Sequence, residues 1–295
     1  MAISEAKMQR GALMVGNWKM VLGQRASRGL AQEIGRGIVE RGLNQQSRVR
    51  YGIAPSSMCI EGVRVALDGF HSNILVGGQS FYAGLSEKGP IIEGAYTGET
   101  SLPQLKEAGA QFSIIGHSER RGIVGYGVRG AAETNAILNE KLRAGLAFVG
   151  DTPELSNFFY IFCVGETLQQ MEAGHTGVVL TEQTQVGLDK VAQQSMDDGR
   201  VVIAYEPVWA IGTGKSASPA PANDSVGLIR SLVEKMYGRE IAKKLMALYG
   251  GSMNLQNMAS LMEQSEIDGG LVGGAFLKAP DSVGMLSQTS EIYKG

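Results

Sequence analysis

The chain has 295 residues, and its 27 Lys and Arg against 29 Asp and Glu give a formal net charge of −2. This balance provides no broad basic surface, so we expect no nucleic-acid partner and no membrane binding, and the apolar runs are too short to span a bilayer. With only two cysteines, Cys59 and Cys163, and no secretion-signal pattern at the N-terminus, we expect a cytoplasmic protein.

Short apolar runs alternate with longer amphipathic stretches along the chain. The predicted strands are residues 12–16, 49–54, 74–78, 112–116, 159–164, 201–205, 245–249 and 270–272. The predicted helices are residues 27–43, 58–67, 102–108, 130–142, 181–195, 222–237 and 255–262, with a last helix after Pro280. Apolar strands that alternate with amphipathic helices indicate a parallel sheet covered by helices. Eight such units favour a closed α/β barrel with outer helices, a (β/α)8 fold, in a single domain over residues 1–295, with an open doubly wound sheet as the alternative.

Five of the predicted strands end in polar or glycine-rich segments. These segments read GNWKM at 16–20, GHSERR at 116–121, YEPVWAIGTGK at 205–215, YGGS at 249–252 and VGG at 272–274. The functional residues of a (β/α)8 barrel lie where the strands end and the following loops begin. We therefore expect the five segments to meet at one mouth of the barrel and to form one site.

Three side chains in these segments have a structural interpretation as well as a chemical one. Glu206 follows a predicted buried strand, so it is either a general base or an ion-pair or capping partner. His117 is either a catalytic imidazole or a hydrogen-bonded core histidine, and Lys19 is either a site cation or a solvated surface lysine. The structural interpretation is the commoner one for each residue alone. The convergence of five segments favours the chemical one.

The segment after the sixth predicted strand is longer than an ordinary βα loop. Pro and Trp at one end and Gly-Thr-Gly-Lys at the other indicate a stiff flap between two hinges, of the kind that closes over a substrate. Its residues are Pro207, Val208, Trp209, Ala210, Ile211, Gly212, Thr213, Gly214 and Lys215. The glycine pairs at 250–251 and 273–274 follow the last two strands, where barrels bind phosphate through backbone N–H groups, although such pairs also serve ordinary turns.

The sequence also contains fragments of two nucleotide-binding patterns. Residues 214–216 match the end of a phosphate-binding P-loop, but the glycine required at position 209 is Trp209, so the pattern fails. Residues 125–130 match GxGxxG, which leaves a nucleotide-binding oxidoreductase as a minor alternative. The residues before this match are charged and unsuited to a buried strand. A missing thermal shift with NAD(H) would exclude this alternative.

Taken together and in order, the five segments resemble the triosephosphate isomerase family. Shorter matches agree with this resemblance: AYTGE at 95–99, CVGET at 163–167 and IDG at 267–269. The resemblance covers residues 16 to about 277, nearly the whole chain. It implies a TIM barrel that interconverts a small phosphosugar pair, dihydroxyacetone phosphate and D-glyceraldehyde 3-phosphate, without a cofactor or a metal. It also implies a place in glycolysis and gluconeogenesis and a homodimer.

The resemblance further implies a role for each residue of the motifs. Glu206 would move a proton between two carbons through an enediolate, and a neutral His117 would polarise the carbonyl. Lys19 and Asn17 would stabilise the developing oxyanion, with Glu119 as a supporting carboxylate. Closure of the flap would keep water from the enediolate. The phosphate would bind backbone N–H groups of Gly212, Ser252, Gly273 and Gly274.

The sequence departs from the family pattern in four places, of which Ser80, where the family commonly has Asn, is one. Extra residues around 84–92 enlarge the loop 79–97, which in this family reaches into the partner subunit, so we expect an altered dimer interface. A second expansion, residues 150–157, precedes the fifth strand at the N-terminal face, and we expect it to be catalytically neutral. Tyr126 stands where the family has a glutamate, so we expect the charge of Arg120 to be left to Glu99 or to solvent.

Two other functions remain open at this point. A related isomerase of a four-carbon phosphosugar, such as erythrulose phosphate, would keep the catalytic residues, and kcat/KM on three- and four-carbon substrates would distinguish it. A catalytically idle barrel paralogue that acts as a binding protein is the alternative from another class. An idle copy has no need to retain Asn17, Lys19, His117 and Glu206 together.

Overall fold

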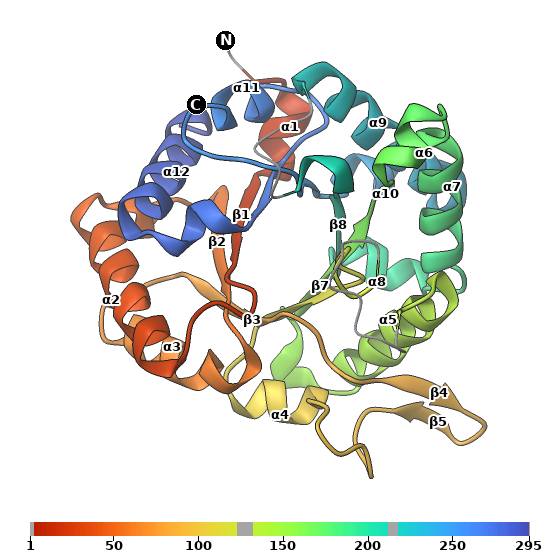
Figure 1. Ribbon diagram of the computed structural model, residues 1–295, viewed down its shortest axis with the longest axis horizontal. Helices are drawn as coiled ribbons and strands as arrows, with labels where there is room; N and C mark the ends of the chain where they lie inside the picture. The colour runs from red at the N-terminus through yellow and green to blue at the C-terminus, as the bar shows by residue number, and fades with distance from the viewer. Residues whose placement is uncertain (1–2, 123–131, 212–217, 295) are drawn as a thin grey trace.

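The computed structural model describes residues 3–122, 132–211 and 218–294, in which eight parallel strands close into a barrel (Figure 1). In sheet order the strands are β1 (Ala12–Asn17), β10 (Gly269–Val272), β9 (Ala247–Tyr249), β8 (Val201–Tyr205), β7 (Phe159–Val164), β6 (Phe112–Ile115), β3 (Leu75–Gly78) and β2 (Val49–Ala54). Pairing of β2 with β1 closes the ring. The predicted (β/α)8 barrel is therefore confirmed, and the open doubly wound sheet is wrong.

Helices form an outer ring around the strands (Figure 1). They are α1 (Glu5–Arg10), α2 (Gln24–Glu40), α3 (Ile60–Asp68), α4 (Leu102–Glu107), α5 (Asn135–Gly150), α6 (Leu168–Glu172), α7 (Thr176–Gly187), α8 (Gln193–Asp197), α9 (Pro219–Tyr237), α10 (Arg239–Lys244), α11 (Met258–Met262) and α12 (Ala279–Ile292). Capping boxes begin two of them, with Ser101 and Gln104 on α4 and Thr167 and Gln170 on α6. In the described ranges no helix is long and apolar enough to cross a membrane.

The predicted helices that differ from the structure do so for local reasons. The helix predicted over 181–195 is two helices, α7 and α8, because the chain turns at Lys190, whose φ is +54°. The helix predicted to end at residue 142 continues to Gly150. The short helices α1, α6 and α10 have no predicted counterpart, since one or two turns give too few apolar positions to show a helical period.

Contacts with the barrel hold α1, which is too short to be stable alone. The buried Lys7 side chain donates hydrogen bonds to the carbonyl oxygens of Met262, Gln264 and Ile267. Arg10 forms an ion pair of 2.7 Å with the buried Asp268, which directly precedes β10. Tertiary contacts rather than helix propensity therefore place α1 at the end of the barrel where the strands begin.

Side chains fill the barrel interior. Phe112 and Phe159 stack there with ring centroids 5.3 Å apart. Gly77 leaves space for Phe112, because a Cβ at this glycine would lie 2.5 Å from the ring. The remaining interior residues are Leu13, Val15, Ala54, Ile114, Ile161, Cys163, Val202, Ala204, Met246, Leu248 and Leu271. A second, larger apolar cluster, with members such as Ile34 and Leu142, joins the strands to the helices around them.

The expansion predicted around 84–92 forms an antiparallel hairpin of β4 (Gly84–Ser86) and β5 (Gly89–Ile91) outside the barrel (Figure 1). Both strands pack against α5. Before the hairpin, the buried Phe81 ring contacts Tyr160 with centroids 5.6 Å apart. The rings of Tyr82 and Tyr96 join the two arms of the loop with centroids 4.1 Å apart. The expansion is thus attached to the outer helices and core of the barrel.

We predict that the fold loses stability at alkaline pH partly through Tyr51. Burial raises the pKa of Tyr51 from 10.0 to about 12, and its Oη donates to the Leu286 carbonyl at 3.3 Å. As the pH rises, the Tyr51 hydroxyl therefore loses its proton at a lower pH in the unfolded chain than in the folded protein. The contribution of Tyr51 to the free energy of unfolding is complete below the unfolded pKa. It is lost as the pH rises toward the folded pKa, by up to about 1.4 kcal/mol per pH unit.

Thermal unfolding of the wild type and of Tyr51→Phe from about pH 8 to about pH 12 measures this loss. The variant keeps the ring but has no proton to release, so its Tm should fall less steeply above the unfolded pKa. Parallel slopes for the two proteins would contradict the assignment.

Candidate active site

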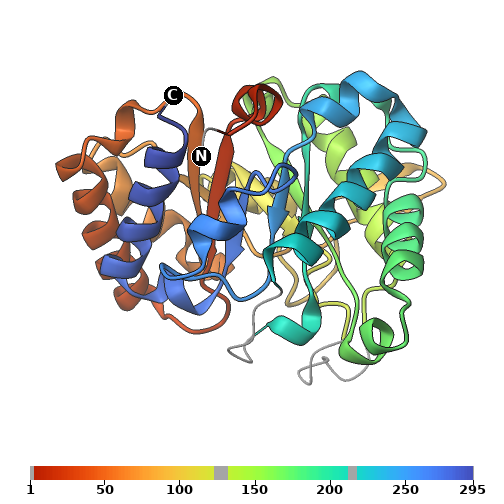
Figure 2. The same cartoon turned by 90° about the horizontal axis from the view of Figure 1, so that it is seen from above.

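The five polar segments meet at the carboxyl ends of the strands, on the face opposite α1, which Figure 2 shows in red at the upper edge. A cavity of about 320 Å³ opens at this face. Its lining includes Asn17, Lys19, His117, Ser252, Gly273 and Gly274. The structure therefore brings together residues that follow four different strands, because parallel strands in a closed barrel all end at the same mouth.

Glu206 directly follows β8 and is 2% exposed. Its Oε2 accepts a hydrogen bond of 2.8 Å from the backbone N–H of Ser118, and its Oε1 lies 3.3 Å from His117 Nε2. In the described part of the chain, Oε1 has no aligned hydrogen-bond donor. The backbone thus holds one carboxylate oxygen, while the other is buried and faces the imidazole.

The chain that follows His117 orients its imidazole. The backbone N–H of Glu119 donates to His117 Nδ1 at 3.3 Å. Nδ1 is therefore the acceptor nitrogen, and the proton of a neutral ring belongs on Nε2. Because Nε2 is the nitrogen that faces Glu206, His117 presents an N–H donor at the mouth of the barrel.

Lys19 lies in a left-handed backbone conformation with a φ of +51°, which is strained for a residue other than glycine. Its N–H donates to Asn17 Oδ1 at 3.0 Å, and Gln79 Nε2 donates to its carbonyl at 2.7 Å. Its Nζ forms an ion pair of 2.7 Å with Glu119 Oε1. These contacts hold both the backbone and the ammonium group beside the cavity, with Glu119 as the ion-pair partner of the ammonium.

The described part of the flap is a short 3₁₀ turn over Val208–Ala210, with Pro207 before it and Ile211 after it. The indole of Trp209 donates to Glu166 Oε1 at 2.9 Å. Ser252 Oγ donates to the Ala210 carbonyl at 2.6 Å, which ties the flap to the segment after β9. The other flap residues lie outside the described ranges: Gly212, Thr213, Gly214 and Lys215. Gly212 is also one of the predicted phosphate-binding residues.

Glu166 and Gln79 are site residues that the sequence prediction missed. The buried Glu166 receives hydrogen bonds from the flap indole and, at 3.1 Å, from the hydroxyl of Tyr205. Burial raises the pKa of Glu166 even though these hydrogen bonds oppose the shift. Gln79 directly follows β3, and Glu166 is the second residue after β7. Both therefore lie at the carboxyl end of a barrel strand, where functional residues of this fold are expected.

The other predicted phosphate-binding residues line the same cavity. The carbonyl of Ser252 accepts a hydrogen bond of 3.0 Å from Asn257 Nδ2, which orders the segment after β9. Gly273 lies close to Lys19, since a Cβ at Gly273 would be 3.5 Å from Lys19 Cε. The lysine and the glycine backbone after β10 therefore flank one small volume, which suits a small anionic ligand.

Arg120 is not left to Glu99 or to solvent, and that prediction is wrong. Its guanidinium pairs with Glu133 Oε1 at 2.8 Å, and the buried Lys141 pairs with the same oxygen at 2.9 Å. Burial raises the pKa of Glu133, but the two cations outweigh it and hold the pKa below its usual value. Glu133 is therefore the acidic partner of Arg120, although Tyr126 stands where the family has a glutamate. Because Glu133 lies 13 residues after Arg120, local spacing could not reveal this pairing.

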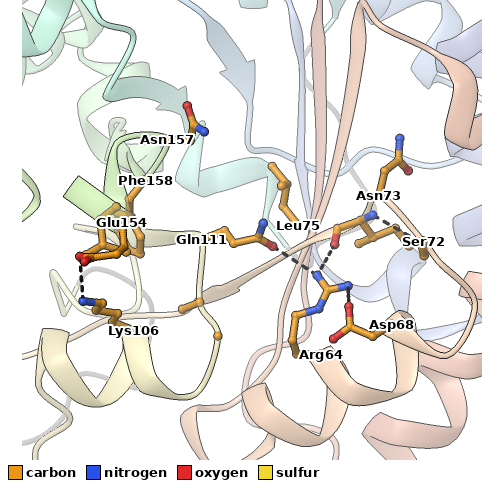
Figure 3. Close-up of a pocket in the computed structure, with 14 residues that line it drawn as sticks. Arg64, Asp68, Ser72, Asn73, Leu75, Lys106, Gln111, Glu154, Asn157 and Phe158 are labelled. Atoms are coloured by element: carbon orange, nitrogen blue, oxygen red, sulfur yellow. Dashed lines mark hydrogen bonds and ion pairs between the residues drawn. The ribbon is translucent and has the colours of Figure 1, made fainter. Parts of the chain in front are cut away.

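A larger cavity, of about 640 Å³, lies at the opposite end of the barrel, where the strands begin (Figure 3). Its charged residues pair with one another, Arg64 with Asp68 at 2.6 Å and Lys106 with Glu154 at 3.3 Å. This cavity therefore lacks the combination of an imidazole, a cation and a buried carboxylate found at the mouth. Glu154 belongs to the second expansion, which lies at the N-terminal face as predicted.

The GxGxxG match at 125–130 lies outside the described residues. The nearest described residues before it, 118–122, form turns rather than the strand that a dinucleotide-binding unit requires. Within residues 3–122, 132–211 and 218–294, no group of three or more His, Cys, Asp or Glu side chains is placed to hold a metal ion.

We predict that Gln79→Met lowers the turnover number of this site by about tenfold or more. The substitution removes the donor shared by the Lys19 and Ala54 carbonyls, at 2.7 and 3.0 Å, and lets the strained lysine backbone relax away from the cavity.

The matched control is Gln111→Met. The Gln111 Oε1 accepts hydrogen bonds from Val76 N at 3.2 Å and from Arg64 at 3.3 Å at the far end of the barrel. This control should lower the Tm and leave kcat unchanged. Equal kcat in the two variants, measured on folded protein, would show that Gln79 has no special effect on the lysine.

A family model described as triosephosphate isomerase matches residues 12–289. Curated relatives carry the same name. The relative from Treponema pallidum is 42% identical over 274 residues, which cover 93% of this chain and 97% of the relative. The relative from Treponema denticola is 40% identical over 265 residues, 90% of this chain and 93% of the relative. The relative from Rhodopirellula baltica is 38% identical over 282 residues, 95% of this chain and 98% of the relative.

Proposed function

The chain belongs to the triosephosphate isomerase family, and we propose that its barrel mouth interconverts dihydroxyacetone phosphate and D-glyceraldehyde 3-phosphate. The observation that carries this proposal is the 3.3 Å separation of Glu206 Oε1 and His117 Nε2, beside Lys19. Moving a proton next to a carbonyl requires a base, a donor to the carbonyl oxygen and positive charge for the oxyanion. These three groups make the site that of an aldose–ketose isomerase.

Glu206 is the base in the proposed reaction. Its Oε1 takes a proton from the carbon next to the carbonyl, and the same oxygen returns the proton to the neighbouring carbon. The Ser118 N–H holds Oε2 and so limits rotation of the carboxylate. Gly250 leaves space for the side chain, because a Cβ there would lie 2.8 Å from Glu206 Cγ. The carboxylate is thus oriented before the substrate binds, which favours a fast proton transfer.

His117, Lys19 and Asn17 stabilise the enediolate that forms between the two proton transfers. The Nε2–H of His117 donates to the oxygens of the enediolate and moves protons between them. The ammonium of Lys19 supplies positive charge, and Glu119, 2.7 Å away, keeps it in place. Fixed donors of this kind act most strongly where charge develops in the transition state.

The segments after β8, β9 and β10 bind the phosphate in this proposal. Backbone N–H groups of Gly212, Ser252, Gly273 and Gly274 are the donors. The hydrogen bond of 2.6 Å from Ser252 Oγ to Ala210 links the phosphate-binding segment to the flap. Binding of the phosphate therefore acts on the flap, whose closure keeps water from the enediolate and discourages phosphate loss.

We predict that Glu206→Gln lowers kcat by about 10³-fold or more, because the amide cannot accept the proton. Glu206→Asp should lower kcat less, since it keeps the base but moves it away from the substrate. A coupled assay measures kcat, and NMR of the substrate in D₂O measures exchange of the carbon-bound hydrogen.

The control for these variants is Glu154→Gln, in the second expansion at the far end of the barrel, which should keep wild-type kcat. It also tests whether that expansion is catalytically neutral. Turnover of Glu206→Gln near the wild-type rate would overturn the assignment of the base.

The same assay distinguishes the substrates. A kcat/KM that is much higher for the three-carbon phosphosugar than for erythrulose phosphate supports the proposal, and the reverse order would replace the substrate. Wild-type activity no higher than that of Glu206→Gln on both substrates would indicate an idle paralogue. A cytoplasmic location and a place in glycolysis and gluconeogenesis belong to the proposal for the three-carbon substrate.

A homodimer is also part of the proposal. Large apolar side chains are exposed beside the mouth: Met20 is 95% exposed, Val21 60% and Met58 71%. Next to them lies a cavity of about 410 Å³, whose lining includes Met20, Lys19 and Glu119. Apolar side chains grouped next to a cavity support a protein partner at this surface, and a second copy is the partner that the family resemblance implies.

We predict that Met20→Glu shifts the protein from dimer to monomer in sedimentation velocity, because a charge at the interface costs desolvation free energy. Turnover should fall with the dimer, since Lys19 is the adjacent residue. Val178→Glu, on the exposed face of α7, is the control and should leave the sedimentation coefficient unchanged. A monomeric wild type would overturn this part of the proposal.

A further inference from the structure

The turn between β6 and His117 packs on an arginine that the proposed reaction does not use. Gly116 has a left-handed φ of +73° and directly precedes His117. A Cβ at Gly116 would lie 3.2 Å from Arg121 Nη2 and 3.0 Å from Leu138 Cδ1. Arg121 therefore contacts the backbone from which the imidazole projects.

Arg121 joins β6 and β7 beyond the end of their pairing. Its Nε donates to the Gly116 carbonyl at 2.8 Å, and its Nη2 donates to the Cys163 carbonyl at 2.8 Å. The register between the strands ends at Ile115 and Phe162, so Gly116 and Cys163 are the next residue on each side. The guanidinium thus continues the connection between the two strands where the backbone ladder stops.

The strand β7, whose Cys163 carbonyl accepts a hydrogen bond from Arg121, also binds the backbone of Glu206. The carbonyl of Val164, the residue after Cys163, accepts a hydrogen bond of 2.7 Å from the backbone N–H of Glu206. The guanidinium therefore bonds to the residue before His117, just beyond β6, and to the residue before Val164 on β7, which is the backbone partner of Glu206. It is connected to both members of the pair whose separation is 3.3 Å.

A third hydrogen bond sets the plane of the guanidinium. Arg121 Nη1 donates to Asn135 Oδ1 at 2.6 Å at the start of α5, and Asn135 Nδ2 donates to Glu182 Oε1 at 3.2 Å on α7. The Phe162 ring lies 5.9 Å from the guanidinium carbon. Each of the three nitrogens of the planar guanidinium therefore donates a hydrogen bond. A lysine ammonium cannot reproduce this geometry.

We propose that Arg121 is a positioning residue for proton transfer, which sets the separation of His117 and Glu206 without touching the substrate. This inference rests on the proposed function. Arg121 is not in the described lining of the mouth cavity, so its loss should change kcat far more than KM. A displacement of about 1 Å between reacting groups lowers a rate by about 10²-fold, which is the size of effect we expect.

The experiment compares Arg121→Ala and Arg121→Lys with the wild type, with and without added guanidinium ion. A cavity of about 450 Å³ borders Arg121, Asn135 and Glu182 and gives a small cation access to the vacated position. We expect kcat of both variants to fall by about 10²-fold with little change in KM. Guanidinium at low concentration should restore kcat of Arg121→Ala in a saturable way, and methylammonium at equal ionic strength should not.

The matched control is Arg64→Ala. Arg64 also donates to a carbonyl and to a side chain and pairs with a carboxylate, but at the far end of the barrel. It should lower the Tm and leave kcat unchanged. If Arg121→Ala also lowers only the Tm, or if guanidinium does not restore its kcat, Arg121 is a structural residue and the inference is overturned.

A readout independent of turnover separates this inference from the proposed function. The chain has three histidines, so the imidazole NMR signals of His117 can be assigned by substitution. Arg121→Ala should shift the His117 signals and leave those of His71 and His175 in place, and guanidinium should reverse the shift. Unchanged His117 signals overturn the inference even in an active enzyme. Shifted signals in a wild type that does not isomerise the substrate support the positioning while the proposed function fails.

If Arg121→Ala does not fold, Asn135→Leu provides the test. It removes the hydrogen bond that fixes the plane of the guanidinium, together with the hydrogen bond from Asn135 to Glu182, and leaves the bonds to both strands possible. We expect a smaller fall in kcat, about tenfold, together with a smaller shift of the His117 signals. Wild-type values of both quantities would contradict the inference.

Discussion

Burial of the Glu206 carboxylate is the constraint on which the arrangement of this site depends. A charged group removed from water loses several kcal/mol of hydration free energy, and the protein offsets the loss only with well-placed donors. Here one oxygen receives the Ser118 N–H and the other faces His117. Both partners come from the end of β6, two strands away from β8 in the sheet. The site therefore exists only while the registers of β6, β7 and β8 are all maintained.

The barrel core maintains those registers. Phe112 and Phe159 on β6 and β7 stack inside the barrel, and Gly77 on β3 gives the first ring its space. Close packing of this kind leaves little freedom for one strand to slide past another. Strain at the mouth, as in the left-handed backbone of Lys19, is tolerated because the surrounding hydrogen bonds and the rigid barrel hold it.

The parts of this structure that the sequence could predict are those encoded locally. Most residues of each barrel strand are apolar, and each of these site residues follows such a strand, so topology alone brought Glu206, His117 and Lys19 to one face. Pairings between distant segments could not be predicted in this way. Arg120 and its partner Glu133 are 13 residues apart, and the three carbonyls around Lys7 come from the other end of the chain. Short elements such as α1 and the β4–β5 hairpin take their structure from such contacts, which a local pattern does not contain.

The position of the chain ends has a practical consequence for handling this protein. The helices α1 and α12 reach the face where the strands begin with the start of α1 and the end of α12 (Figures 1 and 2). The mouth with Glu206 and His117 opens at the other face. A carrier domain, an affinity tag or a solid support attached at either end therefore points away from the cavity. A short peptide that joined the two ends would give a circular chain, which could be reopened elsewhere on the outer ring without cutting through the site.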